Sequence, residues 1–191
     1  ERSFSMNTSV TSRDAILSVS RQFITQNGFG SVNMRAIAAA CGVSVGSVYN
    51  YFPSKGDLIC AVVESVWHDI FHLSGQSSQF SSFPDCVKWL FDSIRQGCEE
   101  YPAFFTLHSL SFSASEKQKG REMMERSFAH IRASMLRVLQ SDPNVRKDAF
   151  DGELGREEFV QMVFTLITIA LLEDKQDCRA LLVLVRRYLY Q

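Results

Sequence analysis

The polar residues with the most informative spacing lie between Asn33 and Lys55. Two short helices are predicted there, one from Asn33 to the turn at Gly42 and one over Val45–Tyr51. Two short helices joined by a glycine-containing turn form the pattern of a helix-turn-helix, whose second helix enters the major groove of DNA. Hydroxyl, amide and methyl groups on that helix can contact base edges. The segment therefore predicts a local nucleic-acid site.

Packing divides this segment into a buried side and an exposed side. Ile37, Ala38 and Val43 are predicted to hold the two helices together, and Val48 to anchor the second helix in the core. The exposed residues expected to face DNA are Val45, Ser47, Asn50 and Tyr51. Tyr49 and Lys55 suit phosphate oxygens.

The rest of the chain shows no catalytic or metal-binding pattern. His68 and His72 have the i, i+4 spacing that can hold a metal from one helical face, but without a carboxylate or cysteine partner a surface or core pair is favoured. The five cysteines are odd in number and contain no C-x-x-C pair, which predicts buried free thiols in a reducing cytoplasm. We therefore expect no enzyme, no metal and no cofactor.

Composition and charge indicate an ordinary folded protein. The 191 residues are 46% hydrophobic and 21% charged, and the net charge of −1 excludes a strongly basic, non-specific nucleic-acid coat. The longest apolar stretch, Val160 to Leu172, is shorter than a bilayer span, and the first ten residues lack the apolar core of a signal sequence. A cytoplasmic location is expected.

Helical periodicity predicts the elements that position these residues. Glycine and proline are scarce (10 and 4), and apolar residues recur at spacings of three and four, so the chain is predicted to be all-α, with about nine helices and no strand. The first helix is expected to start near Thr11, with the Thr11 hydroxyl as its cap. The later helices are expected over about 54–71, 84–100, 103–112, 116–140, 155–173 and 177–190.

The stretch IAAACGVSVGSVYNYFPSKGDL, from Ile37 to Leu58, closely resembles the DNA-binding pattern of the tetracycline-repressor (TetR) family of bacterial transcription regulators. The resemblance covers Arg13 to about Glu64, and beyond it only the helix layout is similar. It implies a helix-turn-helix DNA-binding domain over residues 8–55 and a helical ligand-binding and dimerisation domain over 56–191. The residues it implies for DNA binding are Asn33, Arg35, Ser44, Val45, Gly46, Ser47, Tyr49, Asn50, Tyr51 and Lys55.

Two positions depart from the family pattern. Val45 stands where many members have a polar or basic residue, and Ala36 stands where an acidic residue is common. Lys55 is the only charged residue between Ala36 and Gly56, so a dimer would be needed to double the phosphate-neutralising cations.

Large polarizable side chains in the second domain predict a small-molecule site. Aromatic residues and methionine at helical spacing are more often plain core, and the resemblance is what favours a pocket. The predicted lining residues are Trp67, Phe71, Trp89, Phe104, Phe105, His108, Phe112, Met124, Phe128 and Thr168.

The segment VQMVFTLITIALL is apolar nearly all round, so as a helix it must be covered on more than one side. We expect it to pair with the last helix and meet its twin in a four-helix bundle about a two-fold axis, although a central helix buried in a monomer would have the same pattern. The predicted interface residues are Val163, Leu166, Ile167, Ala170, Leu181, Leu184, Val185 and Tyr188.

These observations favour a homodimeric repressor that binds a near-palindromic operator and is released by a lipophilic or aromatic effector. A regulator controlled by a partner protein, without a small-molecule effector, is the alternative in the same class. A helical enzyme or carrier is the alternative from another class. The dense helix-turn-helix pattern and the lack of a nucleophile with a base argue against that last alternative.

Overall fold

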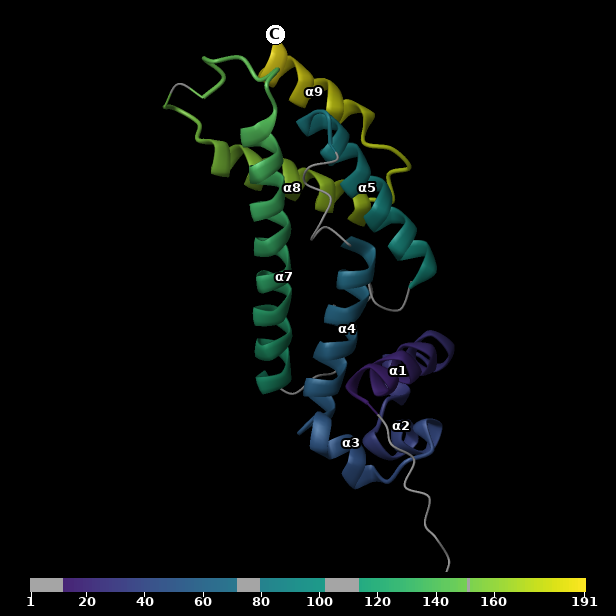
Figure 1. Cartoon of the computed structure of the whole chain (residues 1–191). Helices are drawn as coiled ribbons and strands as arrows, with labels where there is room; N and C mark the ends of the chain where they lie inside the picture. Colours follow the sequence, from purple (N-terminus) through teal and green to yellow (C-terminus); the bar gives the residue numbers. More distant parts are fainter. Residues whose placement is uncertain (1–11, 72–79, 102–113, 151) are drawn as a thin grey trace, which may run out of the picture. The chain divides into compact units, whose positions relative to one another are not determined.

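A computed structural model describes residues 12–71, 80–101, 114–150 and 152–191 (Figure 1). Within these ranges the chain forms eight α-helices and the short 3-10 helix η1 (Phe29–Ser31), and no strand. The prediction of an all-α fold is confirmed. The expected helix between Pro102 and Phe112 lies outside the described residues.

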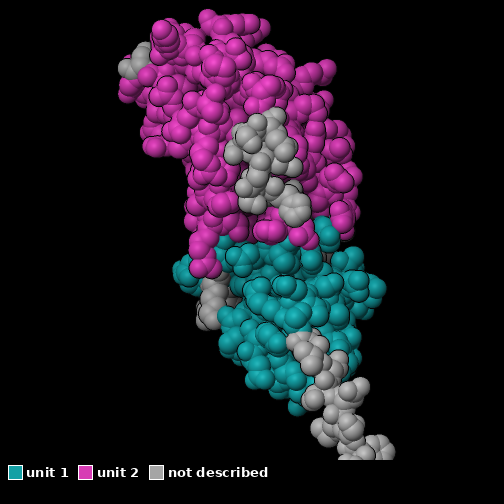
Figure 2. Space-filling view, viewed as in Figure 1, with its two compact units in different colours: residues 1–66, 101–123 teal, residues 67–100, 124–191 magenta. Residues whose placement is uncertain are grey.

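The chain divides into two compact units, which Figure 2 shows in different colours. Unit 1 contains Glu1–Val66 and Tyr101–Met123, and unit 2 contains Trp67–Glu100 and Met124–Gln191. The first segment of unit 1 ends inside a helix, later than the domain boundary expected after Lys55. That boundary stays a prediction.

In unit 1, helix α1 (Arg13–Asn27) begins at a serine cap and ends at a glycine. The Ser12 Oγ accepts a hydrogen bond of 3.1 Å from the backbone N–H of Ala15, so Ser12 is the cap, and the expectation of Thr11 was wrong. At the other end Gly28 has a φ of 74° and donates its N–H to the Ile24 carbonyl. The face of α1 that carries Ile16 and Ile24 is fully buried.

Helices α2 (Met34–Cys41) and α3 (Val45–Tyr51) follow, and α4 (Lys55–Phe71) begins after Pro53. Gly42 ends α2 in the left-handed conformation, with φ 66° and ψ 29°, and its N–H bonds the carbonyls of the last turn. Helix α2 packs against both α1 and α3. The predicted helix-turn-helix is confirmed, including its glycine turn.

In unit 2, α5 (Phe83–Glu100), α8 (Arg156–Leu172) and α9 (Arg179–Tyr190) pack against one another, and unit 2 also contains α7 (Ala114–Ser141) from Met124 onward. The Tyr188 ring of α9 stacks on the Phe159 ring of α8, with centroids 4.9 Å apart and an interplanar angle of 18°. None of the helices in the described part of the chain is long and apolar enough to cross a membrane.

A buried carboxylate joins three helix ends of unit 2. Asp142, 8% exposed, follows α7, and its Oδ2 accepts from the Phe83 N–H at 2.8 Å and from the Tyr190 hydroxyl at 2.5 Å. Its Oδ1 accepts from the Asn144 N–H at 3.0 Å. Burial, followed by the hydrogen bond to Asp142, raises the pKa of Tyr190 above its ordinary value. Three donors thus compensate for the desolvation of Asp142.

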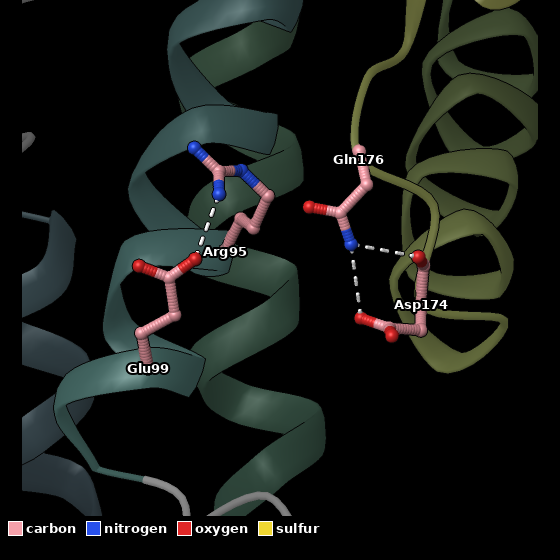
Figure 3. Close-up of polar contacts among 4 residues, drawn as sticks. All are labelled: Arg95, Glu99, Asp174 and Gln176. Atoms are coloured by element: carbon pink, nitrogen blue, oxygen red, sulfur yellow. Dashed lines mark hydrogen bonds and ion pairs between the residues drawn. The ribbon is translucent and has the colours of Figure 1, made fainter.

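The turn between α8 and α9 is held by its own polar groups (Figure 3). Asp174 has a φ of 54°, in the left-handed region. The Gln176 Nε2 donates to the Asp174 carbonyl at 3.1 Å and to its Oδ1 at 3.4 Å. Figure 3 also shows the ion pair on α5, where Arg95 donates to Glu99 at 2.7 Å.

Candidate nucleic-acid interface

Helix α3 is held in unit 1 by one buried side chain and one cap. Val48 is 0% exposed and is the one residue of α3 that is buried. The Ser44 Oγ accepts the Ser47 N–H at 3.1 Å, and the hydroxyls of Ser44 and Ser47 lie 2.9 Å apart. The predicted anchor and cap are both confirmed. Because only Val48 is buried, most of the surface of α3 is left for contact with another molecule.

The outward side of α3 follows from the position of Val48. A helix turns about 100° per residue, so residues two positions before and after a buried residue point away from the core. These are Gly46 and Asn50, and both are exposed. Tyr49 and Tyr51 are also exposed, at 48% and 42%. Val45 and Ser47 are half-buried.

The predicted residues outside α3 lie at the starts of the neighbouring helices. Asn33 caps α2, because its Oδ1 accepts the Ala36 N–H at 2.8 Å, and Arg35 in the first turn is exposed. Lys55 is half-buried at the start of α4, where the Ser54 Oγ accepts the Asp57 N–H at 3.1 Å. The caps of α2, α3 and α4 are therefore all side chains of the same short segment.

Arg13 is a cation that the sequence analysis did not assign to this surface. Its Cζ lies 5.5 Å from the centre of the Phe52 ring, within the range of a cation–π contact, and Phe52 directly follows α3. The Arg13 side chain is exposed and forms no ion pair with any residue that the structure describes. No local pattern could have shown this contact, because α1 and Phe52 are far apart in the sequence.

Comparison with known proteins identifies this segment. Residues 16–62 match the family model described as bacterial regulatory proteins, tetR family. Residues 16–62 therefore form a DNA-binding domain of the TetR family. The regulator UidR of Escherichia coli strain K12 is 41% identical over 51 residues, which are 27% of this chain and 26% of UidR. The repressor KstR of Rhodococcus jostii is 35% identical over 63 residues, which are 33% of this chain and 30% of KstR. The matched segment thus spans only a quarter to a third of these relatives.

Solved structures share the fold over most of this chain. The fatty acid degradation regulator FadR of Bacillus halodurans has a TM-score of 0.61 and 19% identity, covering 92% of this chain and 96% of FadR. FadR of Bacillus subtilis, solved in complex with stearoyl-CoA, has a TM-score of 0.60 and 17% identity, covering 93% and 95%. At these identities the likeness concerns the fold.

Only some of the residues expected to line an effector pocket lie in the part of the chain that the structure describes. Phe104, Phe105, His108 and Phe112 lie outside the described residues, as does the side chain of Phe71. Trp67 and Phe128 contact each other edge to face, with centroids 5.7 Å apart. Thr168 donates to the Phe164 carbonyl of its own helix at 2.9 Å, and Met124 is half-buried. The pocket stays a prediction of the sequence.

Unit 2 encloses a small apolar void between α5 and α7. One residue of the predicted pocket, Trp89, lies at this void. Its volume is about 10 Å³, the space of one water molecule. The residues around it are Phe80, Cys86, Trp89, Leu90, Ser134, Met135 and Val138. Burial raises the pKa of the Cys86 thiol to about 12, so this thiol stays protonated and unreactive. A void of this size and lining suits neither a metal nor an effector.

The predicted interface residues of α8 and α9 fall on two different sides. Val163, Ile167, Leu181 and Val185 are all less than 10% exposed within unit 2, and the half-buried Tyr188 stacks on Phe159. Their place in a dimer interface stays a prediction. Ala170 is half-buried, whereas Leu166 and Leu184 are 42% and 61% exposed. We define the apolar face as these two together with the other large exposed apolar residues of α8 and α9, which are Met162, Ile169, Leu172 and Val183.

The histidine pair and the cysteines of the sequence do not form a metal site in the described part of the chain. His68 is exposed beside Asp69, His72 lies outside the described residues, and no group of three or more potential ligands occurs in the described part. All five cysteines are free, as predicted, but only Cys86 and Cys178 are buried.

Proposed function

We propose that this chain is a dimeric transcriptional repressor that binds a near-palindromic operator and leaves it when a lipophilic or aromatic effector binds. The observation that carries the proposal is the exposed side of α3, held by Val48 and Ser44 and accompanied by the cations Arg13, Arg35 and Lys55. Such a surface combines base-reading groups with phosphate-binding groups. The chain would act on DNA in the cytoplasm.

Dimerisation is supported by the apolar face of unit 2. Six large apolar side chains on two adjacent helices are exposed, and Leu172 reaches 70%. Exposed apolar groups of this kind are typical of a surface that another protein covers. Pairing α8 and α9 with their copies about a two-fold axis would bury this face and would double the cations presented to DNA.

The effector proposal is supported by the fold and by one neighbour. FadR of Bacillus subtilis was solved with stearoyl-CoA, a ligand with a long apolar chain. The Trp67, Phe128 and Phe164 rings of unit 2 form a continuous aromatic cluster, which suits an apolar or aromatic ligand. Helix α4 includes residues of both units, so an effector in unit 2 that shifts α4 would alter the position of α3.

The experiment is a capture of genomic DNA fragments by the purified chain, followed by gel shifts on the recovered sequence. Lys55→Ala should weaken all sequences about equally and lower the slope of log affinity against log salt by about one per subunit. Long-chain acyl-CoAs and aromatic acids should then be tested for release of the bound DNA. A chain that recovers no reproducible sequence would refute the proposal.

Control by a partner protein is a second candidate for the regulation. It is favoured by the void of about 10 Å³ between α5 and α7, which is too small for an effector. Under this candidate the effector panel changes neither the melting temperature nor DNA release, while operator binding by the purified chain remains.

A further inference from the structure

Helix α3 has a neutral surface, which limits how it can recognise a base pair. Its sequence, VGSVYNY, contains no lysine and no arginine. The commonest specific contact of a recognition helix, an arginine or lysine bound to the O6 and N7 of guanine, is therefore not available from α3. Recognition by α3 must use amide, hydroxyl and apolar groups.

The outward ridge of α3 consists of Gly46 and Asn50. They are four residues apart, so they lie one turn apart on the same side, opposite the buried Val48. Asn50 is exposed, and its amide forms no hydrogen bond with the residues that the structure describes. The Ser47 hydroxyl, in contrast, is already paired with that of Ser44 at 2.9 Å. Asn50 is thus the polar group of α3 most available to a base.

No contact in the described part of the chain requires a glycine at position 46. Its φ lies outside the left-handed region, and a Cβ placed there would meet only the Ser44 Oγ, at an ordinary contact distance of 3.7 Å. Glycine is less favourable than alanine inside a helix, so the fold by itself would favour a side chain. The bare backbone on the outward ridge has its use in a close approach by another molecule.

We propose that Gly46 and Asn50 make α3 a reader of A·T base pairs. The Asn50 amide accepts from the N6 amino group of adenine and donates to its N7, while the bare backbone at Gly46 admits the C5-methyl group of a thymine one helical turn away. The alternative, a bidentate contact to guanine from an arginine or lysine of α3, is excluded because α3 contains neither residue. This inference rests on the proposed operator binding and adds the class of base pair that α3 recognises.

Modified bases test the two contacts separately. An operator selected from random duplexes should contain A·T pairs at mirrored positions in its two half-sites. Replacing one adenine by 7-deazaadenine removes the N7 acceptor and should weaken binding of the wild type by about fivefold or more. With Asn50→Ala the same replacement should have no further effect. Replacing a thymine by uracil removes the methyl group and should weaken binding at one position per half-site.

Gly46→Ala gives a result that a structural role would not produce. The variant should keep or raise the melting temperature, because alanine suits a helix better, yet it should bind the operator more weakly. Its loss should be smaller on the uracil operator, where the alanine methyl can occupy the space of the missing thymine methyl. Gly120→Ala is the matched control, since Gly120 lies in α7 with no atom within 4 Å of the added Cβ. It should leave DNA binding unchanged.

The outcomes distinguish this inference from the proposed function. A chain that selects no DNA overturns both. A chain that selects an operator with G·C pairs opposite α3, or whose affinity responds to neither 7-deazaadenine nor uracil, overturns the A·T inference alone. Unchanged operator affinity of Gly46→Ala likewise overturns the role of Gly46.

Discussion

Leu184→Glu tests the proposed dimer at its most informative position. Leu184 lies on α9 and is 61% exposed, whereas its neighbour Val185 is 2% exposed. Complete burial of a leucine side chain contributes about 1.5–3 kcal/mol. If the partner subunit covers the exposed part of Leu184, that contact contributes about 1–2 kcal/mol per subunit and about 2–4 kcal/mol per dimer.

The substitution should weaken association by about 30- to 1000-fold from the lost apolar contact alone. The new carboxylate adds the cost of removing a charge from water. Light scattering over a series of concentrations should show the wild type at twice the chain mass and Leu184→Glu shifted toward the monomer. Weaker operator binding should accompany this shift, because the two half-sites are no longer bound together.

Two further variants separate assembly from folding. Ala133→Glu places the same charge on an exposed position of α7 and should leave the dimer intact. Val185→Glu buries a charge in unit 2 and should lower the free energy of unfolding itself. If Leu184→Glu associates as tightly as the wild type, the apolar face is not the dimer interface and the reasoning from exposure fails.

Two other perturbations address stability within each unit. Val48→Ala removes the buried anchor of α3 and should lower the free energy of unfolding by about 2 kcal/mol, measured by urea denaturation, with weaker operator binding; an unchanged urea midpoint would contradict the role of Val48. Tyr190→Phe removes a donor from the buried Asp142 carboxylate and should cost about 1.5 kcal/mol near neutral pH. Because the folded chain holds the Tyr190 proton more tightly than the unfolded chain, whose pKa is near the ordinary 10.0, this stabilisation is complete below about pH 10 and is lost as the pH rises above it. Urea midpoints across this range should therefore converge for the wild type and Tyr190→Phe, and a constant gap would refute the assignment.

Local chemistry made the helix-turn-helix predictable. Each of its features depends on residues within a few positions of one another. These features are the Ser44 cap, the left-handed Gly42 and the end of α3 before Pro53. The first helix shows the limit of such patterns, because two adjacent hydroxyl residues precede it and only the structure identifies Ser12 as the cap.

Contacts between distant segments were not predictable in the same way. Arg13 over Phe52 and Tyr190 on Asp142 join residues that no spacing relates, so their partners had to be found in three dimensions. The candidate pocket has the same difficulty, since an aromatic residue has the same sequence pattern whether it lines a cavity or fills the core, as the edge-to-face pair of Trp67 and Phe128 illustrates.

The apolar helix α8 best separates what sequence and structure each decide. Its composition alone determines that it must be covered on more than one side. Which side faces its own unit depends on where α5 and α9 pack, and this packing buries Val163 and Ile167 while it leaves Leu166 and Ile169 exposed. The hydrophobic effect is non-directional, so it specifies that these side chains leave water but not which neighbour covers them. Only the tertiary arrangement of the helices assigns each side chain to the core or to the apolar face.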